Sequence, residues 1–215
     1  DVIAQYGADT FRLYEMYMGP LAASKPWNPR DIEGLSRFLA RIWRVAVDEQ
    51  TGKIRTAETP NADVERALHR VIAKVGADIE SLSMNTAIAA LIEFTNLATK
   101  AGSLTADQLG RLTVVLSPFA PHIAEEIWLK LGHTKSLAYE PWPTVDPAML
   151  RDSTVELPVQ INGKVKGKLS VPADADAKAI EAMCMADQKV QQAIEGKAVK
   201  KVVIVPGKII NIVVG

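Results

Sequence analysis

Three lysines at alternate positions give the stretch LPVQINGKVKGKLSVP (157–172) the clearest chemical character in this sequence. Lys164, Lys166 and Lys168 follow one another with no acidic residue between them. A row of cations of this kind is typical of surfaces that bind the phosphates of a nucleic acid. The alternative is an exposed strand that lysines keep soluble. Four further lysines extend this candidate nucleic-acid interface: Lys197, Lys200, Lys201 and Lys208.

A second basic group lies in the N-terminal part of the chain. Arg37, Arg41 and Arg44 are spaced i, i+4 and i+7, which places them within one stripe of an α-helix. Guanidinium groups suit phosphate contacts because they donate in a planar fork. A solvated helix face is the other interpretation of this stripe.

The sequence shows no self-contained catalytic motif beside these cations. GxxxxGK[ST], GxGxxG and HExxH are all absent. HIAEEIW (122–128) offers a histidine and two carboxylates, but no third metal ligand is evident, so we interpret His122 as structural. The single cysteine, Cys184, lies between two methionines and is expected in the core. We therefore predict a binding role, with no catalytic residue, metal or cofactor site in this chain.

The elements that must position the cations fall into two parts. As far as residue 131, apolar residues recur at helical spacing and connections are short, which predicts an all-α antiparallel helix bundle. In the helix after Asn28, we expect one apolar face: Leu35, Phe38, Leu39, Ile42, Trp43 and Ala46. The helices are predicted over these segments: 1–18, from Pro29 with Asn28 as N-cap, after Pro60, 85–100, 106–120 and from Pro121.

A proline-containing linker separates the two parts. Residues 132–156 hold three prolines and little periodicity, and we expect Tyr139 and Trp142 to fix this linker to the bundle. The predicted organisation is a connecting segment (1–24), the helical bundle (25–131), the linker (132–156) and a small α+β domain (157–215).

The small domain changes to a period of two, with a hairpin at Asn162-Gly163. A two-residue loop would pair Ile161 with Lys164 and place lysines among the apolar residues. We therefore predict a three-residue loop, which puts Val159 opposite Val165 and keeps the three lysines of the row on one face.

Two short helices and two strands complete this domain. Asp176 and Asp187 are candidate N-caps for helices over about 177–185 and 188–195, and Gly196 ends the second helix. KKVVIVPGKIINIVVG (200–215) predicts two strands, both central in the sheet, around a type II turn. The order ββ-αα-ββ predicts a sheet covered by helices on one face and open on the other.

Composition and charge limit the class of protein. A chain of 215 residues, 48% hydrophobic, can form one large or two smaller domains, and no apolar run reaches the roughly 18 residues of a membrane span. Residues 1–154 carry 16 Lys+Arg against 19 Asp+Glu, a net charge of −3. Residues 155–215 carry 9 Lys+Arg against 6 Asp+Glu, a net charge of +3. A single cysteine favours the cytoplasm. Because the chain starts at Asp1, we expect a piece of a longer protein or a processed chain.

Six segments in order along nearly the whole chain resemble the C-terminal end of bacterial-type leucyl-tRNA synthetases, a class I family. They are GADTFRLYEMYMGP (7–20), KPWNPRDIEGLSRFLARIWR (25–44), SMNTAIAALIEFTNLA (83–98), LSPFAPHIAEEIW (116–128), LPVQINGKVKGKLSVP (157–172) and KKVVIVPGKIINIVV (200–214). The hairpin and the final segment are the most specific for leucine. Lys166 is one departure, since the family often has arginine there, and lysine keeps the charge without the fork.

The resemblance implies a part of an enzyme rather than a whole one. In the family, a catalytic domain with HIGH and KMSKS signatures activates leucine with ATP and Mg and charges tRNA(Leu), but neither signature nor the editing insert occurs here. The implied roles are binding of the tRNA body by the bundle and of the tRNA elbow by the small domain. Asp9 and Arg12 would lie near the KMSKS loop. The implied partners are tRNA(Leu) and the catalytic and editing domains of the same monomeric, cytoplasmic enzyme.

Alternatives from other classes stay open at this point. One is a protein-interaction or structural module that binds no RNA, and another is a small enzyme whose site is not recognisable. The equivalent part of a valine, isoleucine or methionine enzyme is a further alternative. The single cysteine disfavours the isoleucine enzyme, whose bacterial form typically ends in a cysteine zinc site, and the absence of heptads after residue 154 disfavours the valine enzyme.

Overall fold

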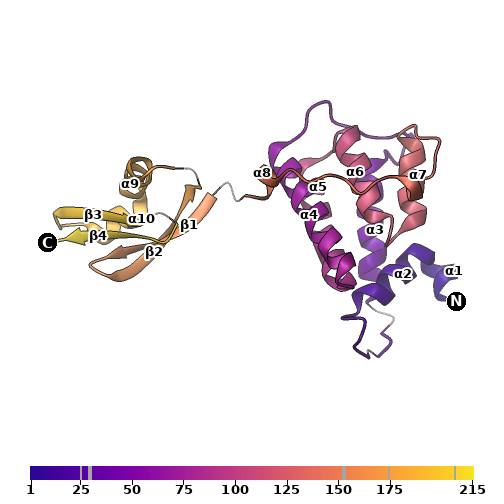
Figure 1. The fold of residues 1–215 in the computed structure, drawn as a ribbon, viewed down its shortest axis with the longest axis horizontal. Helices are drawn as coiled ribbons and strands as arrows, with labels where there is room; N and C mark the ends of the chain where they lie inside the picture. The colour runs from indigo at the N-terminus through magenta and orange to yellow at the C-terminus, as the bar shows by residue number, and fades with distance from the viewer. Residues whose placement is uncertain (25, 29–30, 152–153, 174, 206) are drawn as a thin grey trace. The chain divides into compact units, whose positions relative to one another are not determined.

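The chain folds as two compact units, one spanning residues 1–150 and the other residues 151–215 (Figure 1). The computed structural model describes residues 1–24, 26–28, 31–151, 154–173, 175–205 and 207–215. Each unit has its own hydrophobic core. Within the described ranges, no helix is both long and apolar enough to cross a membrane.

The first unit is a helical bundle with a single core. Its elements are α1 (Val2–Tyr6), α2 (Ala8–Tyr17), α3 (Ile32–Ala46), α4 (Ala62–Glu80), α5 (Met84–Ala101), α6 (Ala106–Leu116), α7 (Pro121–Lys130), the 3-10 turn η1 (Leu137–Tyr139) and α8 (Pro147–Leu150). Helix α2 buries Leu13 and Tyr14 in the same core as α3 to α7. The predicted connecting segment therefore packs as part of the bundle.

Helix α3 begins later than the predicted Asn28 N-cap, because Asn28 is held outside the helix. The Tyr14 hydroxyl accepts from the Asn28 backbone N–H at 2.9 Å and donates to its carbonyl at 3.0 Å. Asp31 is the residue before the first turn, and the predicted first position, Pro29, lies outside the described residues. The predicted buried face is confirmed except at Trp43, which is only partly buried.

Prolines and polar side chains set the ends of the central helices. Asn61 caps α4 by accepting from the backbone N–H groups of Asp63 and Val64. Helix α6 ends at Leu116 rather than at the predicted residue 120, because Pro118 has no N–H to donate to the Val114 carbonyl. The Ser117 hydroxyl donates to that carbonyl instead, at 2.9 Å.

The segment after α7 lies against the bundle, but not through Tyr139 as predicted. Tyr139 is 89% exposed, whereas Leu137 is buried in the core. Trp142 does contact the bundle: its indole lies beside Gly76 of α4, where a Cβ would come within 3.2 Å of Nε1. A side chain at position 76 would therefore require Trp142 to shift by a few tenths of an ångström.

A polar cluster joins α4, α6 and this last segment. Glu65 accepts from Arg111 at 2.8 and 3.0 Å, from Gln108 at 2.8 Å and from His69 at 3.1 Å. The other ring nitrogen of His69 accepts from the Asp146 backbone N–H at 3.1 Å. Burial would raise the pKa of Glu65, but hydrogen bonds from Gln108 and then Arg111 outweigh it and hold the pKa below its ordinary value.

Glu65→Gln should lower the free energy of unfolding of the helical unit by about 1–2 kcal/mol at pH 7, because hydrogen bonds to a charged carboxylate contribute more than those to a neutral amide. The pKa of Glu65 is lower in the folded chain than its ordinary value of 4.5. The carboxylate therefore stabilises fully above that value, and this contribution is lost as the pH falls through the folded pKa.

Denaturation followed by tryptophan fluorescence measures this effect in the helical unit alone, because all four tryptophans lie before residue 151. The difference in the free energy of unfolding between the parent and the Gln variant should become smaller below about pH 4.5. If this difference in unfolding free energy is the same at pH 7 and at the lowest pH where the unit remains folded, the stabilising role of the Glu65 carboxylate is contradicted.

The second unit is a mixed four-stranded sheet, with helices α9 and α10 on one face (Figure 1). Its elements are β1 (Thr154–Ile161), β2 (Lys164–Pro172), α9 (Ala177–Ala186), α10 (Gln188–Ile194), β3 (Val199–Val205) and β4 (Ile209–Val214). The strand order is β2-β1-β4-β3, with β1 and β4 parallel and the other pairs antiparallel. Strand β4 is central as predicted, whereas β3 is an edge strand.

The predicted caps of the two short helices are confirmed. Asp176 accepts from the Ala179 N–H at 2.7 Å, and Asp187 accepts from the Val190 N–H at 3.0 Å. Gly196 follows α10 with a φ of 76°, a conformation that favours glycine. The turn between β3 and β4 includes Pro206, which lies outside the described residues.

The predicted three-residue hairpin loop is wrong. Ile161 pairs with Lys164 across the two-residue loop Asn162-Gly163, and both loop residues have positive φ, as a type I′ turn requires. A β-bulge then corrects the parity, because Val159 lies opposite Gly167 and Gln160 opposite Val165, leaving Lys166 as the extra residue. Alternation of apolar and polar residues predicts the loop correctly only in a regular strand, and the bulge breaks that alternation.

The Asn162 side chain ties this hairpin to β4. Its amide nitrogen donates to the Val214 carbonyl and its oxygen accepts from the Val214 N–H, both at 3.0 Å. The Asn162 backbone N–H donates to the Ile212 carbonyl at 2.9 Å. These bonds continue the parallel pairing of β1 with β4 beyond the last strand residue and fix the hairpin's register.

Asn162→Ala should destabilise the sheet unit by about 2–3 kcal/mol, because it removes two hydrogen bonds and places alanine at positive φ. Asn162→Gly is the matched control. Glycine accepts positive φ, so this variant should show only the part of the destabilisation that comes from the two lost hydrogen bonds. Residues 155–215 contain no aromatic side chain, so hydrogen exchange of β4 reports this unit and tryptophan fluorescence reports the other. Unchanged exchange of β4 in both variants would contradict this role.

Candidate nucleic-acid interface

The three lysines of the row on β2 do not share one face of the sheet. Lys164 lies opposite Ile161, whose side chain is buried against the helices, so Lys164 belongs to the helix-covered face at the end of the strand. Lys168 lies opposite Pro158, on the open face. Lys166 occupies the bulge and lines a small hollow that residues of α10 also line. The prediction of a single lysine face is therefore wrong, and the bulge is the physical reason.

Lys168 differs from the other two lysines of the row because it has an acidic partner. Its ammonium lies 3.1 Å from a carboxylate oxygen of Glu156, and both side chains are largely exposed. An exposed pair of this kind contributes little to stability, but it reduces the positive charge available to an anionic ligand. Lys164 and Lys166 are exposed and, within the described residues, make no ion pair.

The strand register sorts the remaining predicted lysines by their position along the sheet. Ile161 pairs with Ile212 and Ile212 with Val202, so the Asn162-Gly163 turn and the start of β3 lie at the same end of the sheet. Three predicted lysines are therefore at the hairpin end, each exposed: Lys197, Lys200 and Lys201. Lys208, also exposed, lies in the β3–β4 turn at the opposite end.

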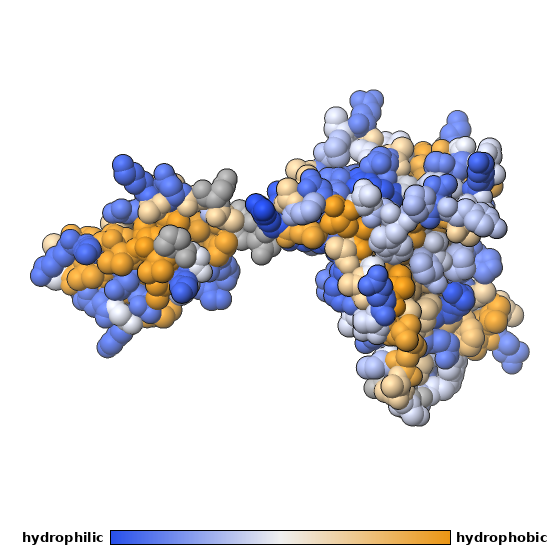
Figure 2. Space-filling model, viewed as in Figure 1, coloured by the Kyte–Doolittle hydropathy of each residue, from blue (hydrophilic) through white to orange (hydrophobic). Residues whose placement is uncertain are grey.

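The open face of the sheet carries exposed valines among polar side chains such as Gln160 and Asn211. Val165, Val203 and Val205 are 61%, 37% and 39% exposed. Figure 2 shows hydrophobic surface on this unit with hydrophilic side chains projecting around it. Because the unit has no aromatic residue, base stacking on this face is excluded as a means of binding single strands. The arrangement favours contacts to a phosphate backbone at the basic end of the sheet.

The predicted arginine stripe lies on the outer side of α3. Arg37 and Arg44 are exposed, and Arg37 lies 3.7 Å from Glu33 one turn earlier. Arg41 is half-buried, and its Nε is a buried donor with no hydrogen-bond partner. The stripe is therefore brought together as the spacing predicts, with Arg44 as its most available guanidinium.

Arg55 adjoins this stripe, and the sequence analysis missed it. An isolated bridge between Val47 and Ile54 returns the chain to the end of α3, where Arg55 donates to the Arg44 carbonyl at 3.2 Å. A turn closed by the Asp48 carboxylate makes this return possible. The hydrogen bonds from Thr51 lower the pKa of Asp48. Asp48 followed by Gly52 was the available sequence pattern for such a turn.

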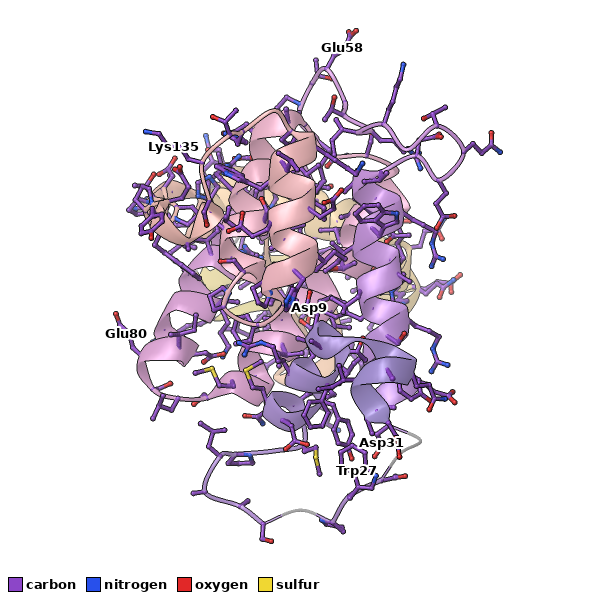
Figure 3. The ribbon with its side chains drawn as sticks, turned by 90° about the vertical axis from the view of Figure 1, so that its right-hand side faces the viewer. Asp9, Trp27, Asp31, Glu58, Glu80 and Lys135 are labelled. Carbon is purple, nitrogen blue, oxygen red and sulfur yellow. The ribbon has the colours of Figure 1, made fainter. Side chains whose placement is uncertain are left out.

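Asp9 and Arg12 have clear contacts within the bundle. The Asp9 carboxylate accepts from the backbone N–H groups of His122 (3.3 Å) and Ile123 (2.8 Å) at the start of α7, and from His122 Nδ1 at 2.7 Å. Arg12 donates to the carbonyls of Pro118 and Phe119 just before α7. Figure 3 shows Asp9 inside the bundle, in contrast to Glu58, Glu80 and Lys135 at its edges. Both residues of α2 therefore fix the corner between α6 and α7.

The histidine and cysteine contacts are structural. In HIAEEIW, His122 binds Asp9, Glu125 accepts from Ser136 and Leu137, and Glu126 lies near Lys130, so the three side chains have separate partners. Over the described residues, no group of three His, Cys, Asp or Glu could hold a metal. Cys184 is fully buried as predicted, and burial raises the pKa of its thiol.

A family model described as the anticodon-binding domain of tRNA ligase matches residues 61–181. The chain belongs to this family. The match begins at the N-cap of α4 and ends within α9, so it includes the β1–β2 hairpin with its lysines. The arginine stripe and the lysines at 197–208 lie outside the matched range.

Curated leucine–tRNA ligases are similar over all, or nearly all, of this chain. The leucine–tRNA ligase of Mycobacterium ulcerans (strain Agy99) is 50% identical over 219 residues that cover all of this chain, and that of Nocardia farcinica (strain IFM 10152) is 49% identical over 99% of it. The chain spans 22% and 23% of the length of these relatives.

A solved structure has a similar fold over the same extent. It is the ternary complex of Agrobacterium radiobacter K84 agnB2 LeuRS with tRNA and LeuAMS, with a TM-score of 0.74 and 30% sequence identity. The similarity covers all of this chain and 30% of that one.

Proposed function

We propose that this chain is the tRNA-binding part of a leucine–tRNA ligase, and that the whole enzyme charges tRNA(Leu) with leucine. The observation that carries the proposal is the 50% identity to a leucine–tRNA ligase over all of this chain, including the sheet unit. The tRNA present in the similar LeuRS complex supports an RNA ligand.

Each unit has its own place in this proposal. The helical unit contacts the tRNA body, with Arg37, Arg41 and Arg44 facing phosphates. The sheet unit contacts the tRNA elbow through the basic end of the sheet. Residues 155–215 contain 9 Lys and 6 Asp+Glu, and this excess of positive charge supports the assignment, because phosphate contacts dominate affinity for nucleic acids.

The remaining chemistry belongs to other parts of the enzyme. ATP and Mg act in a catalytic domain, and neither HIGH nor KMSKS occurs in this sequence. The partners of the chain are the catalytic and editing domains of the same ligase. Asp9 and Arg12 fix the α6–α7 corner and, in the whole enzyme, lie near the KMSKS loop. The ligase is a cytoplasmic monomer.

A salt titration of binding tests the proposal. The chain should bind leucine tRNA more tightly than an RNA of equal length that lacks the folded elbow, and log K should fall linearly with log salt. Lys164, Lys166 and Lys168 to Gln should reduce the slope by about 1.5, the value for two lost contacts rather than three, because Glu156 already occupies Lys168.

Circular dichroism serves as the control for folding, since exposed lysines contribute little to stability and the triple variant should unfold at nearly the parent temperature. Equal binding of the two RNAs with a flat salt dependence would contradict the proposal and favour a protein-interaction module.

A further inference from the structure

Lys189 lies beside the lysines of the β1–β2 hairpin, although 21 positions separate it in sequence from Lys168. It is the second residue of α10 and is exposed. Lys166, Lys168 and Lys189 all line one small hollow, together with Gly167 and Val190. Lysines of β2 and α10 therefore lie close together around this hollow.

The bulge separates Lys166 from Lys168. Lys166 lies two positions after Lys164 and stays on the helix-covered side, and Gly167 then lies opposite the buried Val159. The extra residue therefore places Lys168 on the open face, opposite Pro158. Lys164 also belongs to this side, because it pairs with Ile161. Three lysines from two elements are thus gathered at one corner of the unit.

Nearby acidic groups leave this corner positively charged. Asp187 lines the same hollow, but its carboxylate is engaged as the cap of α10, accepting from the Val190 N–H at 3.0 Å. Among the described residues, no carboxylate lies within ion-pair distance of Lys164, Lys166 or Lys189, in contrast to the pair of Lys168 with Glu156.

We infer that Lys164, Lys166 and Lys189 form one patch that binds the phosphates of an RNA backbone. The inference rests on the proposed tRNA-binding function and adds Lys189 to the lysines of the hairpin. It leaves out Lys168, which also lines the hollow but whose ammonium is paired with Glu156. The RNA backbone therefore passes along the corner where β2 meets α10 and not across the open face of the sheet.

The test compares Lys189→Gln with Lys178→Gln in the full chain. Lys178 is a closely matched control, because it is exposed and is the second residue of α9, after the Asp176 cap, as Lys189 is the second residue of α10, after Asp187. Neither change should destabilise the unit, since each removes an unfavourable charge from a helix start. Hydrogen exchange verifies that both variants are folded.

Binding of leucine tRNA is measured at several salt concentrations. Lys189→Gln should reduce the slope of log K against log salt by about 0.7–0.9 and the affinity at 0.1 M salt by about fivefold or more, while Lys178→Gln matches the parent. If the parent binds and the two variants behave alike, the inference is overturned and the proposed function stands. If the parent itself fails to bind the tRNA, the proposed function is overturned, and the inference with it.

Discussion

The hydrogen bonds between the Asn162 side chain and the backbone of Val214 determine how the sheet unit presents its charge. They join the β1–β2 hairpin to β4 and require a tight turn in which Asn162 and Gly163 both have positive φ. A two-residue turn places Ile161 opposite Lys164, so the bulge at Lys166 is needed to return Leu169 and Val171 to the core. The distribution of lysines over two faces follows from this one turn.

The helical unit depends on comparable long-range contacts of polar side chains. Asp9 and Arg12 on α2 bind the backbone at the corner between α6 and α7, and Glu65 joins α4 to α6. Asp9 and Arg12 bind backbone N–H and C=O groups near helix ends that have no partner within a helix, whereas Glu65 binds the side chains of α4 and α6. They also hold the arginine-bearing α3 within a defined bundle, because α2 and α7 both contact α3 in the same core.

The sequence predicted features that depend on local chemistry. The apolar face of α3, the Asp caps of α9 and α10 and the burial of Cys184 follow from spacing and hydrogen-bonding capacity, and all are present. The bulge was missed because alternation alone cannot distinguish a regular strand with an odd loop from a two-residue turn with one extra residue. Tyr139 was misplaced because its neighbour Leu137 fills the core site. The partners of Asp9, more than a hundred residues away, depend on tertiary packing that no local pattern records.

The central claim is that RNA lies along the helix-covered corner of the sheet unit. Acetylation of lysines in the presence and absence of leucine tRNA, quantified by mass spectrometry, tests it without altering the protein. The account predicts that the tRNA protects Lys164, Lys166 and Lys189, whereas Lys168, Lys178 and Lys208 react as in the free chain. Protection of Lys168 and Lys208 with Lys189 still reactive would contradict the account and place the RNA elsewhere on the unit.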